Sequence, residues 1–132
     1  VQVIGVSIDS QFTHFAWRNT PTDKGGIGEV QFPMVADVNH EITAAYAYAH
    51  PTDSVALRSS FLIDCDGLVQ HQVVNNLPLG RDVDEMVRLV DALQFTEEHG
   101  EVCPAGWRKG QQGMKADAGG VAEYLKSHAD SL

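Results

Sequence analysis

Two cysteines, Cys65 and Cys103, are the residues of this 132-residue chain best suited to covalent chemistry. A thiolate is a strong nucleophile, and its sulfur can be oxidised reversibly to a sulfenic acid or a disulfide. Neither cysteine belongs to a Cys-x-x-Cys pair, which disfavours a zinc knuckle or a redox dithiol. The six histidines are dispersed, so we expect no metal site. A cysteine that matters here is therefore better explained as a catalytic or redox-active thiol than as a structural one.

Composition and charge narrow the range of partners. The chain carries a formal charge of −9, and its lysines and arginines are scattered along it. Binding to phosphate backbones needs clustered cations, so we expect no nucleic-acid partner. No apolar run is long enough to span a bilayer and no secretory leader opens the chain, so we expect no membrane partner and a reducing, cytoplasmic location.

The hydrophobic pattern predicts alternating strands and helices around one core. In chain order we expect strands at 1–8 and 32–36, each followed by a helix, then a hairpin of strands 56–63 and 68–74, and a long helix over 80–100. This order predicts an α/β sandwich, and a hairpin followed by a helix is how a thioredoxin-like fold ends. A domain rarely starts inside a strand, so we also expect sequence upstream of Val1.

The segment from residue 101 onward has a different composition. It is rich in Gly, Lys and Ala and lacks apolar periodicity, apart from a short helix expected near 121–127. Its apolar surface is too small for a core of its own, so it is either loosely attached or docked on something else.

Five segments carry a resemblance to a known family. In chain order they are DSQFTHFAW at 9–17, GGIG with FPMVAD at 25–28 and 32–37, RSSFLID at 58–64, NLPLGR at 76–81, and HGEVCPAGW at 99–107. Together they resemble the typical two-cysteine peroxiredoxins, the group that includes alkyl hydroperoxide reductase C. The last segment resembles the resolving-cysteine motif of that family and is the most specific of the five.

The resemblance implies a fold and a domain organisation. It implies a thioredoxin-like, three-layer α/β/α fold whose N-terminal strands and first helix precede residue 1. Residues 1–100 would be the C-terminal portion of that domain, and residues 101–132 a tail that carries the resolving cysteine. The family's peroxide-attacking cysteine lies upstream, in a motif with no counterpart here, so we expect this chain alone to lack its nucleophile.

The resemblance also assigns roles to individual residues. Cys103 would be the resolving cysteine, which usually reaches the partner subunit of an antiparallel dimer; the alternative is an inert thiol in a mobile tail. Arg58 lies in an apolar strand, where residue type alone favours a surface position, but the matching family arginine lowers the pKa of the attacking thiolate and polarises the peroxide. Arg81 resembles a second arginine near the site, although a surface-turn role explains it equally well. Cys65 is interpreted as an incidental turn thiol.

We therefore expect a peroxidase that reduces hydrogen peroxide and organic hydroperoxides through a sulfenic acid and an intersubunit disulfide at Cys103. A thioredoxin-like protein or a flavoprotein would reduce the disulfide, and no cofactor or metal is implied within the chain. The partner would be a second copy of the chain in a homodimer. Such dimers could assemble further into a ring. The alternative function is a redox-inert, thioredoxin-fold interaction or chaperone-like module, which would have no need of the Cys103 motif.

Overall fold

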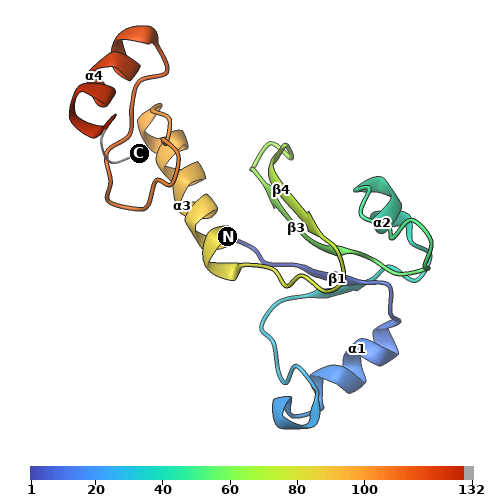
Figure 1. Cartoon of the computed structure of the whole chain (residues 1–132). Coiled ribbons are helices and arrows are strands. Elements are labelled where there is room, and N and C mark those ends of the chain that lie inside the picture. Colours follow the sequence, from blue (N-terminus) through green and yellow to red (C-terminus); the bar gives the residue numbers. More distant parts are fainter. Residues whose placement is uncertain (130–132) are drawn as a thin grey trace. The chain divides into compact units, whose positions relative to one another are not determined.

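The computed structural model describes residues 1–129 and confirms the predicted order of strands and helices. Figure 1 shows the elements, which in chain order are β1 (Gly5–Ser7), α1 (Gln11–Arg18), a 3₁₀ turn (Thr22–Lys24), β2 (Met34–Ala36), α2 (Glu41–Ala45), β3 (Arg58–Ile63), β4 (Val69–Asn75), α3 (Val83–His99) and α4 (Ala118–His128). They fall into two compact units. The first unit comprises residues 1–59 and 74–80, and the second comprises residues 60–73 and 81–129.

In the first unit, β1 pairs with β2 in parallel, with Gly5 opposite Met34 and Ser7 opposite Ala36. The strand is shorter than the predicted 1–8, because the described pairing with β2 extends only over Gly5–Ser7. Val1, at 87% exposure, lies outside this ladder. A strand exists only as far as its backbone groups find partners, so the apolar pattern overestimated its length.

Helix α1 begins where its cap residue predicts. The Ser10 hydroxyl accepts a hydrogen bond from the Thr13 backbone N–H, which satisfies one of the free donors of the first turn. His14 is the buried residue of this helix, and its Nε2 lies 2.6 Å from the Ser7 Oγ at the end of β1. This contact joins the buried face of α1 to the β1–β2 pair.

Asp37 organises the start of α2. Its carboxylate accepts hydrogen bonds from the backbone N–H groups of Ile42 and Thr43 and from the Thr43 hydroxyl. Burial acts to raise its pKa, but these hydrogen bonds outweigh it and hold the pKa of Asp37 below its usual value. Asp37 therefore caps the helix, although the residue directly before α2 is His40, in a left-handed conformation at φ +60°.

The predicted hairpin is formed by β3 and β4, which are neighbours in one sheet. In its turn, the Asp64 carboxylate accepts hydrogen bonds from the backbone N–H groups of Asp66 and Leu68. Gly67 adopts φ +84°, the left-handed conformation that the turn sequence predicts.

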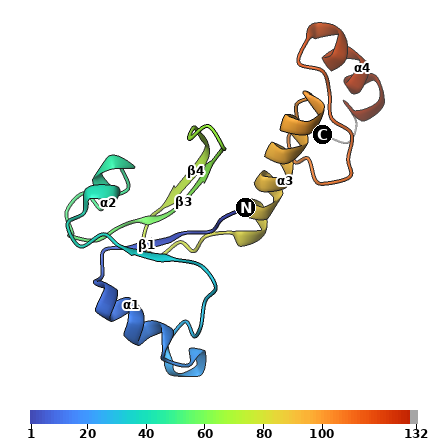
Figure 2. The same cartoon turned by 180° about the vertical axis from the view of Figure 1, so that it is seen from behind.

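In the second unit, α3 is bounded by two residues of the expected types. The Asp82 side chain accepts a hydrogen bond from the Glu85 N–H at the start of the helix. At its end Gly100, with φ +66°, donates its N–H to the Thr96 carbonyl. Figure 2 shows the chain reversing there and the following segment running back beside the C-terminal half of α3, before α4 closes the described part of the chain. Helix α4 is longer than the expected 121–127 because Asp117 caps it at Gly120 N–H.

Candidate functional site

Cys103 lies against α3, three residues after the reversal at Gly100. Its Sγ is 3.8 Å from the Ala92 carbonyl oxygen, to which the thiol donates, and 4.0 Å from the Thr96 Oγ1. The residue is half-buried. The thiol is therefore docked on the surface of a helix, and of the two explanations for the tail, docking is the one that the structure confirms.

Trp107 is the anchor of this docked segment. It is only 2% exposed, the most deeply buried of the large apolar residues. Its ring packs on that of Phe95 from α3, with the centroids 4.9 Å apart and the planes tilted by 41°. The indole Nε1–H donates to the Gln111 carbonyl at 3.0 Å, so the polar edge of the ring is also satisfied.

Arg88 joins the same segment to α3 through its whole guanidinium group. Its Nε and Nη2 donate to the two oxygens of Glu85 at 2.6 and 2.7 Å, and its Nη1 donates to the Trp107 carbonyl at 2.8 Å. The hydrogen bonds from Arg88 hold the pKa of Glu85 below its usual value. In return, the hydrogen bond to Glu85 raises the pKa of Arg88, and an electrostatic interaction with Cys103 acts in the same direction. The guanidinium thus stays charged while it binds a carboxylate and a carbonyl.

Further contacts close the loop around Trp107. Val102 and Met114 exchange two backbone hydrogen bonds, of 2.9 and 3.0 Å, in an isolated antiparallel bridge. Gly113 is buried beside this bridge, and a Cβ there would lie 2.6 Å from the Phe95 ring, which explains why the position needs glycine. On the exterior, Lys109 Nζ lies 2.8 Å from Asp91 Oδ1, although the lysine side chain is 75% exposed.

The two other predicted site residues are Arg58 and Arg81, whose expected role is beside the attacking thiolate and not beside Cys103. Arg58 begins β3 in the first unit, where it is exposed and donates its Nε–H to the Leu77 carbonyl at 3.2 Å. Arg81 is exposed and directly precedes the Asp82 cap of α3, in the same unit as Cys103. From there to Ala92 the helix rises roughly 15 Å, so Arg81 and Cys103 are not brought together.

Arg88 is a further cation of the second unit, and it is hydrogen-bonded to the segment that carries Cys103. Sequence reasoning did not single it out. The only local signal is its spacing of three residues from Glu85, which is typical of an ordinary ion pair on a helix surface. Cys65 is exposed in the hairpin turn, in agreement with its interpretation as an incidental thiol.

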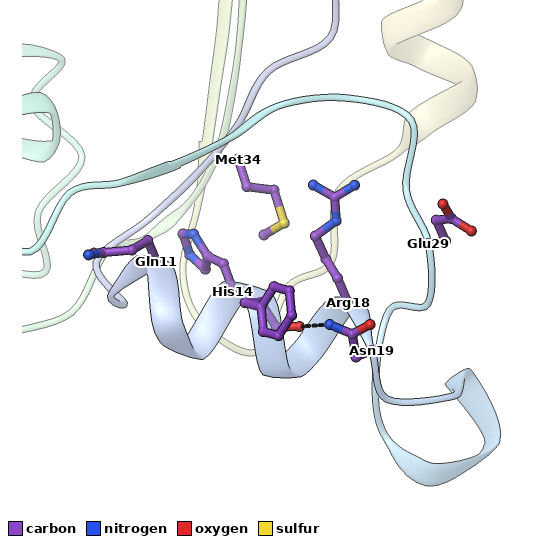
Figure 3. A pocket seen from close by; sticks show the side chains of 7 residues that line it. Gln11, His14, Arg18, Asn19, Glu29 and Met34 are labelled. Atoms are coloured by element: carbon purple, nitrogen blue, oxygen red, sulfur yellow. Dashed lines mark hydrogen bonds between the residues drawn. The ribbon is translucent and has the colours of Figure 1, made fainter.

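A hollow on the first unit contains none of the predicted site residues. Its lining residues, whose side chains are drawn in Figure 3, are Gln11, His14, Phe15, Arg18, Asn19, Glu29 and Met34. Within the described residues, the buried Nδ1 of His14 has no hydrogen-bond partner there. The Arg18 guanidinium is held by the Val30 carbonyl at 2.8 Å. The hollow contains no nucleophile for redox chemistry.

The described residues 1–129 contain neither a metal-binding cluster nor a membrane-spanning helix. No group of three or more His, Cys, Asp or Glu side chains is placed to hold a metal ion in that range. Within the same residues, every helix is too short or too polar to cross a bilayer.

Comparison with known proteins places the chain in a family. A model of the AhpC/TSA family matches residues 1–72, which is more than half of the chain. The chain belongs to the AhpC/TSA family. A second model, the C-terminal domain of 1-Cys peroxiredoxin, matches residues 92–127 of this peroxiredoxin and so includes the docked segment with Cys103.

Individual relatives agree with the assignment. The chain is 61% identical over 130 residues to alkyl hydroperoxide reductase C of Helicobacter pylori strain J99, covering 98% of this chain and 65% of that protein. It is 46% identical over 127 residues to peroxiredoxin-2 of Mus musculus, covering 96% of this chain and 64% of that protein. The chain thus spans a little under two thirds of the length of the curated relatives that it matches.

A solved structure confirms the fold class. The reduced 2-Cys peroxiredoxin of Plasmodium vivax superposes with a TM-score of 0.92 at 47% identity, over 96% of this chain and 65% of that one. The mitochondrial 2-Cys peroxiredoxin of Plasmodium falciparum gives 0.74 at 46% identity, over 79% of this chain and 61% of that one. The predicted α/β, thioredoxin-like class and the resemblance to two-cysteine peroxiredoxins are both confirmed.

Proposed function

We propose that this chain is the resolving-cysteine part of a thiol-dependent peroxidase that reduces hydrogen peroxide and organic hydroperoxides. Residues 1–100 would belong to the thioredoxin-like domain, and residues 101–132 would be the tail that delivers Cys103. The observation that carries the proposal is the setting of Cys103, a thiol in a family-specific sequence that is docked on α3 within a segment bound by the charged Arg88. An inert tail thiol would need neither the docking nor the cation.

The proposed reaction has two steps. A thiolate from a cysteine outside these 132 residues attacks the peroxide, the O–O bond breaks, and the alcohol or water leaves with a proton as the sulfur becomes a sulfenic acid. The Cys103 sulfur then attacks the sulfenic sulfur, an S–S bond forms, and the hydroxyl group leaves as water with the Cys103 proton. A thioredoxin-like protein or a flavoprotein would return the disulfide to two thiols.

The remaining assignments follow from the same proposal. Arg58 would favour the attacking thiolate and the charge that develops on the leaving oxygen, with Arg81 as a second cation near that site. Cys103 would react with the partner subunit of a homodimer, and such dimers could assemble into rings. We expect the enzyme to work in the reducing environment of the cytoplasm.

The full-length protein carrying Cys103→Ser tests the proposal. After one equivalent of hydrogen peroxide, the unaltered protein should form a disulfide-linked dimer on a non-reducing gel, and the variant should remain monomeric while still consuming that first equivalent. Cys65→Ser is the matched control and should form the dimer normally, because Cys65 lies exposed in a turn. A redox-inert interaction module would consume no peroxide in any of the three proteins.

A further inference from the structure

The docked position of Cys103 has a consequence for its reactivity. Its Sγ points at the Ala92 carbonyl and the Thr96 hydroxyl of its own α3. A disulfide requires the two Cα atoms to approach within about 7 Å and the sulfur to be open to the incoming group. A thiol directed at its own helix meets the second condition only after the turn has left that helix, so release of the turn precedes resolution.

Besides the contacts of the thiol itself, three kinds of contact oppose this release. One is the packing of Trp107 on Phe95, and another is the ion pair of the exposed Lys109 with Asp91. The third is the hydrogen bond from Arg88 Nη1 to the Trp107 carbonyl, which lies four residues from Cys103. This bond reaches the backbone of the turn itself, so it restrains the path of the chain rather than a side chain.

Of the two polar contacts, the hydrogen bond from Arg88 is stronger than the Lys109–Asp91 ion pair. Arg88 is charged and its side chain is only 18% exposed. It donates two hydrogen bonds to the Glu85 carboxylate, and these fix the direction in which its Nη1–H group points. Charge-assisted, bidentate contacts of this kind are about twice as strong as neutral ones. In the Lys109 pair the lysine side chain is 75% exposed, and ion pairs of exposed side chains contribute little.

We propose that Arg88, oriented by Glu85, is a positioning residue that latches the Cys103–Trp107 turn on α3 and so sets the rate at which Cys103 resolves the sulfenic acid. The inference rests on the proposed function and deepens it. Arg88 does not touch the peroxide. It acts through the turn that carries the thiol.

The latch also governs the fate of the sulfenic acid. While Cys103 stays docked, the sulfenic sulfur remains exposed to a second peroxide, whose attack converts it to a sulfinic acid with loss of water or alcohol. A firm latch therefore favours overoxidation, and a weak latch favours the disulfide. The split between the two products reports the latch separately from the first attack on peroxide.

The test uses the full-length protein with Arg88→Met, which removes the donor to Trp107 but keeps an unbranched side chain of helical propensity. Stopped-flow mixing with peroxide measures the first attack and the later formation of the disulfide, and intact mass measures the sulfinic product. We expect the disulfide step to accelerate by on the order of tenfold, the worth of one charge-assisted hydrogen bond, and the sulfinic fraction to fall. The first step should keep its rate.

Two further variants complete the design. Glu85→Gln leaves Arg88 in place but loosens its orientation, so this variant should accelerate the disulfide step by a smaller factor. It also replaces Arg88→Met in the test if Arg88→Met does not fold. Lys109→Gln is the matched control, because it removes the other cation that ties the same segment to α3; it should change the step less than twofold.

The outcomes are distinct. An unchanged or slower disulfide step in Arg88→Met and Glu85→Gln overturns the latch, as does an equal acceleration in Lys109→Gln. Failure of the proposed function gives another result, because the unaltered protein would then form no disulfide that Cys103→Ser abolishes.

Discussion

Replacement of Trp107 by alanine should release the docked segment from α3 without unfolding the rest of the chain. The indole is 2% exposed and packs on Phe95, so its loss leaves a cavity where a large aromatic ring had been. Truncations of this kind cost about 3–5 kcal/mol. The hydrogen bond from Nε1 to the Gln111 carbonyl is also lost. Because each 1.4 kcal/mol is a factor of about ten, the equilibrium for opening the segment should rise by two to three orders of magnitude or more.

Amide hydrogen exchange measures this opening directly. Val102 and Met114 donate their N–H groups to each other's carbonyls across the loop that Trp107 anchors, so their protection factors report the local stability of the segment. Both should fall by at least a hundredfold in Trp107→Ala, whereas the Asp64–Leu68 hairpin turn should be unaffected. Trp107→Phe is the matched control: it keeps the ring contact and loses only the N–H donor, so the change should be about tenfold or less. Unchanged protection in Trp107→Ala would refute the role of this residue as the anchor.

Three smaller predictions concern the elements that support the site, each measured by urea unfolding of the full-length protein. Asp37 has a lowered pKa, so its contribution to stability is present above its unfolded-state pKa of 3.8 and is lost as the pH falls through the lower folded-state pKa. Asp37→Asn should therefore be less stable at neutral pH and should lose less stability on acidification. An acid profile identical to that of the unaltered protein would contradict the role of Asp37. Asp82→Ala should cost about 1 kcal/mol through loss of the cap on α3, a reasoning that fails if Asp82→Asn, which keeps an oxygen acceptor, costs as much. Gly100→Ala should cost about 1–2 kcal/mol because of its φ of +66°, and a stabilising effect would rule out that explanation.

The local boundaries of the fold could be predicted from the sequence, because they depend on neighbouring residues. Ser10 and Asp82 are N-cap types placed before apolar periodicity, and both accept the expected backbone hydrogen bonds. Gly67 and Gly100 stand where a left-handed residue is needed, and both have positive φ. In each case the chemistry lies within a few positions along the chain, so a single sequence contains the required information.

The docking of the tail could not be predicted in this way. Trp107 is one aromatic residue in a polar segment, and its burial depends on Phe95, twelve positions earlier on another element. Arg88 was missed for the same reason: its spacing from Glu85 explains one side of the guanidinium, but its bond to Trp107 joins residues nineteen positions apart. Contacts of this range follow from the path of the chain after Gly100, which no local pattern encodes.

The predicted arginines illustrate a different limit. Family motifs identified Arg58 and Arg81 by position, but their role requires a thiolate that has no counterpart in these residues. In the described structure Arg58 is exposed and donates to a neighbouring carbonyl, and Arg81 is exposed before α3. Their part in peroxide chemistry therefore stays a prediction.

The most direct measurement of the central claim is a map of the disulfide formed on oxidation. The full-length protein would be treated with one equivalent of hydrogen peroxide, blocked at its free thiols, digested without reductant and examined by mass spectrometry. The account predicts that the peptide containing Cys103 is linked to a peptide from another cysteine outside these 132 residues, and that Cys65 is recovered with the blocking group. Peroxide consumption with Cys103 recovered as a free, blocked thiol would contradict it.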